Sequence, residues 1–304
     1  MDFDLSIGAA ASAAVEYTLD NFSPTLDAIA DVIGFFASGI KDALSWFPPW
    51  AFIGAVALFA FWRVGWKFAV LCGAALLLIV GMGLWKETIE TLALVIAATA
   101  IAITLGIPLG IFMARSSITA AGARPLLDLM QTMPAFVYLI PAAMFFGLGA
   151  VPGTIATVIF SMPPVVRLTA LGLTQVSREY VEAGLAFGCT DRQLLFKVQF
   201  PLALPSIMAG VNQTIMLGLS MVVIASMIGA GGLGNTVLTG IQRLDVGLGF
   251  EGGLAVVILA IILDRLTQSL SRPAAFKLPR AVRQETGAKE DATDMKTALA
   301  EASA

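Results

Sequence analysis

The run IETLALVIAATAIAITLGIPLGIFM, residues 89–113, is apolar throughout except for Glu90, its sole charged residue. A helix needs about 20 mainly apolar residues to cross the hydrocarbon core of a bilayer, so this run predicts a transmembrane helix. The whole chain has the same character. Of its 304 residues, 58% are hydrophobic and 13% are charged, against about a quarter charged in soluble domains. With a mean hydropathy of +0.88, the sequence predicts an integral membrane protein.

Six further apolar runs accompany this one. The predicted spans are 48–63, 66–84, 89–113, 130–149, 151–173, 205–228 and 252–271. The first is short, and Pro134 and Pro141 interrupt the fourth. Proline is tolerated inside a span when neighbouring groups satisfy the freed carbonyls. The predicted fold class is therefore all-α, a polytopic membrane helix bundle of about seven transmembrane helices.

The distribution of lysine and arginine predicts the orientation, because these residues concentrate in cytoplasmic loops. Threading seven spans with the N-terminus outside gathers most of them on one side: Arg63, Lys67, Arg115, Arg124, Arg167, Arg178, Arg192, Lys197, Arg265, Arg272, Lys277, Arg280 and Arg283. The other side keeps Lys41, Lys86 and Arg243. We expect a multi-pass inner (plasma) membrane protein with its N-terminus outside and its C-terminus cytoplasmic. If one short span were absent, the N-terminus would lie on the cytoplasmic side instead.

Two segments flank the predicted transmembrane domain, residues 48–272. Within residues 1–47, the stretch 25–47 spaces its apolar residues as an amphipathic helix does. We expect this helix to lie in the outer membrane interface; packing on a partner domain is the alternative. Residues 273–304 mix charges with few large apolar residues, which is typical of a disordered cytoplasmic tail. Asp2 and Asp4 stand where a signal peptide carries basic residues, so no cleaved leader is expected.

Composition excludes several kinds of chemistry. Histidine is absent, which removes His-based catalysis and His metal ligation. Cys72 and Cys189 stand in dissimilar contexts, so no disulfide framework is expected. A net charge of −3 without a basic stripe gives no support for nucleic-acid binding. The sequence has no G-x-x-x-x-G-K-[ST] run. We therefore expect no catalytic residue, metal or cofactor in this chain, and energy for any transport from a partner chain or from an ion gradient.

The longest polar stretch between spans is residues 174–204, TQVSREYVEAGLAFGCTDRQLLFKVQFPLAL. Most connections are short, so a loop of this length indicates a role. Residues 178–187 read as a short helix that Gly188 ends, because glycine accepts the left-handed conformation there. A second helix begins at Thr190 or Asp191, both good N-cap residues. The pattern predicts a rigid projection from the membrane, with a solvated linker as the alternative.

This loop resembles the cytoplasmic loop of ABC-importer permeases, whose pattern is Glu-Ala-Ala, three residues, Gly, nine residues, Ile, one residue, Leu-Pro. The chain has Glu182-Ala183-Gly184, then Gly188, then Val198-Gln199-Phe200-Pro201, and departs from the pattern at 184, 198 and 200. In that family the loop docks on the ATPase subunit. The resemblance implies that the coupling residues are Glu182, Ala183, Gly184, Gly188, Cys189, Thr190 and Pro201. Small residues at 183 and 184 are expected to let the partner approach closely.

Three more stretches, 131–149, 163–176 and 201–234, are similar to permeases of the importers for glycine betaine, proline betaine and choline. The resemblance implies the permease subunit of an ATP-binding-cassette importer for glycine betaine, choline or a related quaternary-ammonium osmolyte. It also implies a homodimer of this chain, two copies of an ATPase subunit and an extracytoplasmic substrate-binding protein. An ion-coupled secondary transporter of a small solute and a non-transporting scaffold are the alternatives.

Polar residues within the span 205–228 are candidates for the translocation path: Asn212, Gln213, Ser220 and Ser226. Such residues either line a path or hold helices together, and the sequence leaves both open. The run Gly229–Gly234 is expected to break the helix near the outer face, as a gate hinge or as a simple turn.

The charged residues of the spans are predicted to fall at span ends: Glu87, Glu90, Asp128, Asp264 and Arg265. Gradient-driven carriers usually bury ionisable residues at mid-membrane. Their absence from the span centres favours the ATP-driven interpretation over the ion-coupled one.

Overall fold

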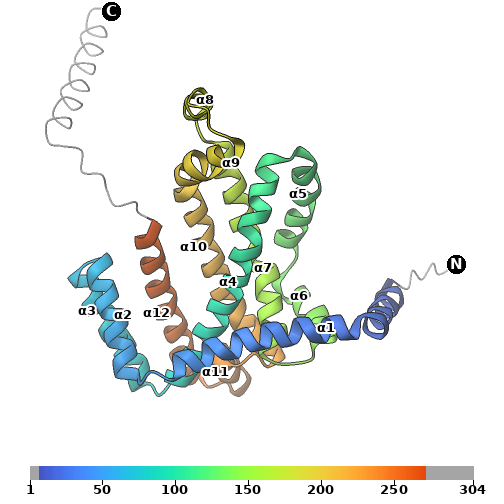
Figure 1. Ribbon diagram of the computed structural model, residues 1–304. Helices are drawn as coiled ribbons and strands as arrows, with labels where there is room; N and C mark the ends of the chain where they lie inside the picture. Colours follow the sequence, from blue (N-terminus) through green and yellow to red (C-terminus); the bar gives the residue numbers. More distant parts are fainter. Residues whose placement is uncertain (1–6, 272–304) are drawn as a thin grey trace, which may run out of the picture. The chain divides into compact units, whose positions relative to one another are not determined.

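The computed structural model describes residues 7–271, and the regular structure in this range is entirely helical. The elements are α1 Ile7–Ser45, α2 Pro49–Arg63, α3 Trp66–Gly81, α4 Trp85–Arg115, α5 Ser117–Thr132, α6 Ala135–Phe146, α7 Ala150–Thr174, α8 Arg178–Ala186, α9 Asp191–Gln193, η1 Leu194–Gln199, α10 Phe200–Ala225, η2 Ser226–Ile228, α11 Gly232–Arg243 and α12 Val246–Ser271. The prediction of an all-α membrane bundle is confirmed (Figure 1). The predicted tail, residues 273–304, and the start of the chain at Asp2 and Asp4 lie outside the described residues.

Three long helices, α4, α7 and α10, form the core of the bundle (Figure 1). Glycines bring their backbones close together. A Cβ atom at Gly110 of α4 would lie 2.6 Å from the Cβ of Thr169 on α7, and one at Gly210 of α10 would lie 3.0 Å from the Cα of Val165. Small residues at such contacts are typical of membrane bundles, where close packing holds the helices together. The core helices are therefore fixed against one another.

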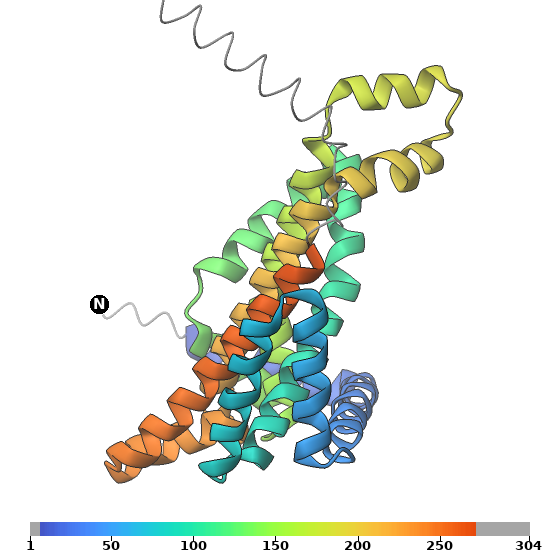
Figure 2. The same cartoon turned by 90° about the vertical axis from the view of Figure 1, so that its left-hand side faces the viewer.

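A hairpin of α2 and α3 forms one flank of the bundle, with α12 between it and the core (Figures 1 and 2). The inner face of the hairpin is buried: Cys72 and Leu76 of α3 belong to the same apolar cluster as Ile258 and Ile262 of α12. The outer face of the hairpin stays exposed in the single chain.

Four helical stretches are long and apolar enough to cross a membrane, or up to six if each of two bent pairs is one span. The four are α4, α7, α12 and the continuous stretch Asp191–Ile228 that contains α10. The predicted spans 48–63 and 66–84 are present as α2 and α3, with 15 and 16 residues. Both are shorter than the roughly 20 residues of an ordinary span.

The predicted span 130–149 is wrong as a single straight helix. It contains the junction of α5 and α6, which meet at a bend of 102°. Met133 and Pro134 have extended backbone there, because proline lacks a backbone N–H and disfavours the helical conformation of the preceding residue. The hydroxyl of Tyr138 donates to the carbonyl oxygen of Met130 at 2.6 Å across the bend. The two short helices therefore form one broken, internally fastened unit.

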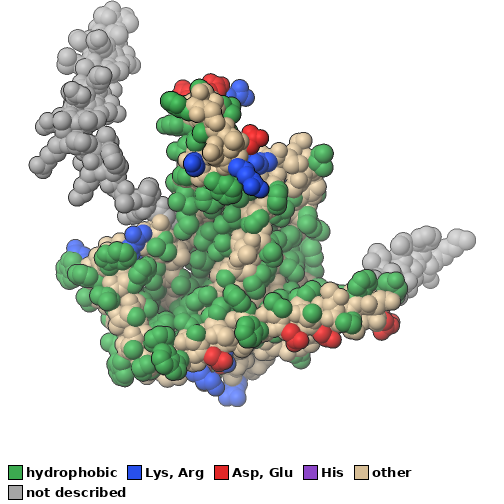
Figure 3. Space-filling view, in the orientation of Figure 1, with side chains coloured by type: hydrophobic (Ala, Val, Ile, Leu, Met, Phe, Trp, Pro, Cys, Tyr) green, Lys and Arg blue, Asp and Glu red, His purple; other side chains and the backbone are tan. Residues whose placement is uncertain are grey.

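Helix α1 extends well beyond the predicted stretch 25–47 and meets α2 at a bend of 95°. It crosses the end of the bundle opposite α8 and contacts α4, α6 and α7 (Figure 1). Lys41 Nζ donates to Glu90 Oε1 of α4 at 2.9 Å, which fastens α1 to the core. Acidic side chains gather along one edge of α1 and apolar ones along another (Figure 3).

The segment after α10 contains a helix that the sequence did not predict. The predicted break is confirmed, since Gly229, Gly231 and Gly232 all have positive φ. Helix α11 then runs from Gly232 to Arg243 and packs on α12. Its glycine-rich, weakly apolar start resembles a turn, which is why the sequence pattern concealed it.

Candidate coupling loop and translocation surface

The segment between α7 and α10 folds into the projecting two-helix unit that the sequence predicts (Figures 1 and 2). We call residues 178–199 the knob. Helix α8 ends before Gly188, whose φ is 78°. The Gly188 N–H donates to Leu185 O at 2.9 Å and the Cys189 N–H to Gly184 O at 3.1 Å, which makes a left-handed helix end. A Cβ at Gly188 would meet nothing within 4 Å, so backbone conformation, not space, requires the glycine.

Thr190 opens the return helix of the knob, as predicted. Its Oγ1 accepts from the Gln193 N–H at 3.4 Å, and its own N–H donates to Gln193 Oε1 at 3.0 Å. This reciprocal pair is a capping box. Residues 194–199 then form a π-helix, η1, which runs directly into α10. Pro201 lies in the first turn of α10, a position that tolerates proline.

The base of the knob is fastened to the core helices. Arg115 Nη2, at the end of α4, donates to the backbone oxygen of Asp191 at 2.9 Å. Leu195 of η1 is buried in one apolar cluster with Leu173 of α7 and Ile207 of α10. A force on the knob therefore reaches α4, α7 and α10 through direct contacts.

Gly184 faces the inside of the knob, although residues 183 and 184 were both expected to admit a partner. It is buried, and a Cβ there would lie 2.8 Å from Leu194 Cδ1 of η1. The residue is small because α8 packs on η1 at this point. Glu182 and Ala183 are exposed, and Cys189 is half-buried. Of the three consecutive residues 182–184, Gly184 therefore packs inside the knob, whereas Glu182 and Ala183 lie at its surface.

Large apolar side chains are exposed around the knob, and the sequence analysis did not single them out. Tyr180, Leu185, Phe187 and Phe196 are 56%, 52%, 89% and 61% exposed. Charged side chains stand beside them at the tip and the base (Figure 3). A group of exposed apolar side chains on a polar segment is typical of a protein-binding surface. Their irregular spacing along a short helix, a turn and a π-helix hides them from periodicity arguments.

Two of the four candidate path residues use their side chains in hydrogen bonds within the bundle. Asn212 Nδ2 donates to Asp264 Oδ1 of α12 at 2.9 Å, and Asn212 Oδ1 accepts from Thr267 at 2.6 Å. Ser226 is buried and donates to the backbone oxygen of Val223 at 2.6 Å. For Asn212 the structure favours the helix-holding role that the sequence left open, whereas the bond of Ser226 lies within its own helical stretch.

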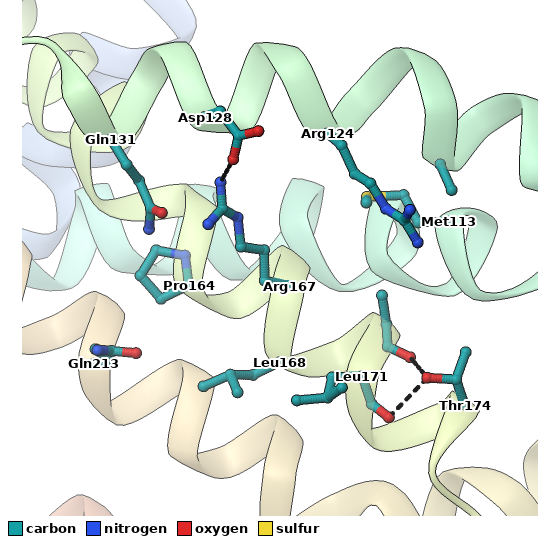
Figure 4. Close-up of a pocket in the computed structure, with 12 residues that line it drawn as sticks. Met113, Arg124, Asp128, Gln131, Pro164, Arg167, Leu168, Leu171, Thr174 and Gln213 are labelled. Atoms are coloured by element: carbon teal, nitrogen blue, oxygen red, sulfur yellow. Dashed lines mark hydrogen bonds and ion pairs between the residues drawn. The ribbon is translucent and has the colours of Figure 1, made fainter.

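The other two candidates, Gln213 and Ser220, are exposed two turns apart on one face of α10. Gln213 borders a cavity of about 600 Å³ that α5 and α7 line (Figure 4). In this cavity Arg167 of α7 pairs with Asp128 of α5. Arg167 lies two turns before the end of α7. The Arg167–Asp128 pair therefore lies along the length of α7 and not at its end. Gln213 joins the exposed face of α10 to this cavity, and the two together form a candidate path surface.

The N-terminal end of α4, which lies opposite the end that contacts the knob, binds the glycine-rich turn at Gly229–Gly234. Glu90 Oε2 accepts from the Gly232 N–H at 3.3 Å, and Thr91 Oγ1 accepts from the Leu233 N–H at 2.8 Å. A carboxylate is favourable at a helix N-terminus because of the helix dipole. Since Glu90 also pairs with Lys41, α1, α4 and the start of α11 meet at one side chain.

These features define a helical membrane subunit with a projecting knob that is fastened to its core helices, and its sequence carries no nucleotide-binding motif. The family of binding-protein-dependent transport system inner membrane components matches residues 106–273. The chain belongs to this family, the permease subunits of ABC importers.

Characterised relatives cover most of the chain. It is 50% identical over 258 residues to a glycine betaine/proline betaine transport system permease, ProW, of Escherichia coli K12, which covers 85% of this chain and 73% of the relative. It is 51% identical over 264 residues to a glycine betaine/carnitine transport permease, GbuB, of Listeria monocytogenes, covering 84% and 92%. A glycine betaine permease of Bacillus subtilis, OpuAB, is 46% identical over 256 residues, covering 84% and 91%.

Among solved structures, an inward-facing form of the MetNI methionine ABC transporter matches with a TM-score of 0.56. The match covers 60% of this chain and 92% of the other at 19% identity, which supports the fold. The ion-coupled alternative is not favoured by these relatives.

Proposed function

We propose that this chain is the permease through which an ABC importer carries glycine betaine or a closely related quaternary-ammonium solute into the cell. The observation that carries the proposal is the built coupling knob, with Gly188 at φ 78°, in a chain 50% and 51% identical to permeases named for glycine betaine. The bilayer, a second copy of this chain, two ATPase subunits and an extracytoplasmic binding protein complete the proposed assembly.

The exposed apolar side chains of the knob supply the proposed docking surface for the ATPase. Leu185 and Phe187 follow closely after Glu182 and Ala183, two exposed residues of the matching loop pattern. A cleft in the partner would bury the apolar groups, at about 25 cal/mol per Å² of apolar surface removed from water. Because η1 runs directly into α10 and Arg115 holds Asp191, ATPase closure would move the inner ends of α4 and α10.

The proposed translocation path follows the exposed face of α10, past Gln213 and Ser220, beside the cavity that holds the Arg167–Asp128 pair. A second copy would close this face into a path. We propose no aromatic cage for the trimethylammonium group here, since the residues that line the cavity include no aromatic side chain.

We also propose that the knob is cytoplasmic and that α1 lies in the outer interface, so that residues 1–47, 48–272 and 273–304 form an outer segment, the permease and a cytoplasmic tail. The side chains of α1 support this placement. Its exposed acidic residues Asp20, Asp27 and Asp31 lie on one edge, whereas Phe22, Ile29 and Phe36 are exposed on another. Such a helix suits the boundary between water and acyl chains.

Cysteine labelling tests the orientation of the knob. A cysteine at position 192, in a background without the native cysteines, should resist an impermeant thiol reagent in intact cells; labelling from outside would reverse the orientation.

Reconstitution tests the proposed function. The chain, its ATPase and the binding protein would be placed in liposomes, and uptake of radiolabelled glycine betaine, choline and proline betaine would be followed. We expect uptake that requires ATP and all three components. Uptake by the permease alone would identify an ion-coupled carrier, and failure of all three solutes with an active ATPase would refute the substrate.

A further inference from the structure

The distribution of tryptophan marks one flank of the molecule. The chain has five tryptophans, and all of them lie at the two ends of the α2–α3 hairpin. Trp46, Trp50 and Trp85 stand at one end, where the rings of Phe52 and Trp85 meet edge to face at 5.6 Å and Trp46 and Trp85 border one cavity. Trp62 and Trp66 stand at the other end, at the turn of the hairpin.

Both rows of tryptophan are built as membrane anchors. Trp46, Trp50, Trp62 and Trp66 are 82%, 69%, 76% and 63% exposed, although tryptophan has a large apolar surface. Tryptophan is enriched at both membrane–water interfaces, where its amphipathic ring sits at headgroup level. Basic side chains accompany the row at the turn. The Arg63 guanidinium lies 5.7 Å from the centroid of the Trp62 ring, and Arg63 Nη2 donates to the Ser269 backbone oxygen of α12 at 2.8 Å.

The surface between the two rows is apolar and uncovered in the single chain. Leu58, Val70, Leu71, Leu77 and Leu78 are exposed there, while the other face of the hairpin packs on itself and on α12. Two tryptophan rows bordering a strip of exposed aliphatic side chains fit lipid acyl chains with headgroups at each end. A protein partner on this flank would not explain why tryptophans stand at both ends of the exposed aliphatic strip.

The helices between the two rows are short for a bilayer. Helices α2 and α3 have 15 and 16 residues, which at 1.5 Å per residue gives about 22–24 Å. The hydrocarbon core of an ordinary bilayer is about 30 Å thick. The core helix α4, which begins at Trp85 beside the same tryptophan row, has 31 residues, about 46 Å. The hairpin is therefore the short side of a bundle whose core is long.

We propose that the α2–α3 flank binds a locally thinned bilayer and selects phospholipids with short acyl chains. A span shorter than the hydrocarbon core is accommodated by thinning the bilayer or by snorkelling of the flanking residues, at a cost that grows with the mismatch. Arg63 is held by Ser269 and by the Trp62 ring, so its freedom to snorkel is small. The lipid next to this flank adjusts instead.

The confinement of tryptophan to the hairpin allows a direct test, which does not depend on the solute or the ATPase. The full-length chain would be reconstituted in phosphatidylcholine with monounsaturated chains of 14 to 22 carbons, and quenching of tryptophan fluorescence by the dibrominated form of each lipid would give relative binding constants. We expect binding of the 14-carbon lipid about threefold or more above that of the 22-carbon lipid. A constant that is independent of chain length, or that rises with it, would overturn the proposal. Weak quenching by every brominated lipid would also overturn it, since the flank would then be covered by protein.

Two variants sharpen the result. Trp85→Phe removes the tryptophan that is half-buried against Phe52 and keeps the four exposed ones, so the preference should be unchanged. Insertion of one apolar helical turn into α2 and one into α3 lengthens the flank by about 5–6 Å and should move the preferred chain length upward. If the lengthened chain lacks native helicity by circular dichroism, the chain-length series on the natural sequence decides alone.

Discussion

Replacing Gly188 by valine should uncouple the knob while leaving the membrane bundle intact. Gly188 has φ 78°, and a Cβ there has open space around it. The cost of valine therefore comes from the backbone alone. The left-handed conformation costs a residue with a Cβ about 1–2 kcal/mol, and a β-branched side chain makes it a clear outlier. That free energy corresponds to a factor of about 5–30 in the ratio of native to non-native loop.

If the backbone relaxes to negative φ instead, the knob loses its two closing hydrogen bonds, from Gly188 to Leu185 and from Cys189 to Gly184. Each is worth about 0.5–1.5 kcal/mol net, so α8 would separate from the return helix. By either route we expect solute uptake to fall; for the strained backbone the upper limit of the fall is the change of about 5–30-fold in the ratio of native to non-native loop. Residue 188 lies outside the candidate spans of the bundle, so insertion into the membrane should be unchanged.

The assay is uptake of radiolabelled glycine betaine by cells that express the whole importer, with the permease level measured by immunoblot and the bound ATPase by co-purification. Gly188→Asn is the matched control, because asparagine tolerates the left-handed region and should keep most of the uptake. Normal uptake and normal ATPase binding in the valine variant would show that the loop is only a linker. An equal loss in both variants would show that side-chain bulk, not backbone strain, is the cause.

Three further changes probe the packing of the bundle and the knob. Gly184→Leu should overpack the contact with η1, costing about 1–3 kcal/mol, and speed amide hydrogen exchange in the knob; Ala183→Leu, at an exposed position, should not. Thr190→Ala should cost about 1 kcal/mol by removing the N-cap, seen as faster exchange just after it, and Thr190→Ser should restore protection. Asn212→Leu should lower the melting temperature in detergent, since it removes two hydrogen bonds between α10 and α12, each worth about 0.5–1.5 kcal/mol net. Gln213→Leu should leave that temperature unchanged, and an equal drop in both would contradict the assignment of the α10–α12 contact.

Local sequence rules predicted the helical membrane fold and the outline of the knob. Residues 89–113 are long and apolar enough to identify α4 alone, and Gly188 and Thr190 act through neighbours within five residues. The bend between α5 and α6 also had a local cause in Pro134, yet apolar composition on both sides of it indicated a single span.

Roles that depend on distant partners were not predictable. Asn212 could line a path or hold a helix until its partner was seen to be Asp264, far along the chain. Gly184 looked like a surface residue because its contact with Leu194 forms only when α8 folds back on η1. Helix α11 needs Glu90 and Thr91 of α4 at its N-terminus, and no pattern within 232–243 contains them.

The π-helix at the base of the knob, η1, fixes the direction in which the rest of the knob points. A π-helical turn holds one residue more than an α-helical turn, and each residue of an α-helix turns the chain by about 100°. Deleting a single residue from Leu194–Gln199 would make the helix regular and swing α8, with Glu182 and Phe187, about a quarter of a turn around the axis of α10. The length of this one short segment therefore fixes the direction in which the exposed face of α8 points, independently of the side chains on that face.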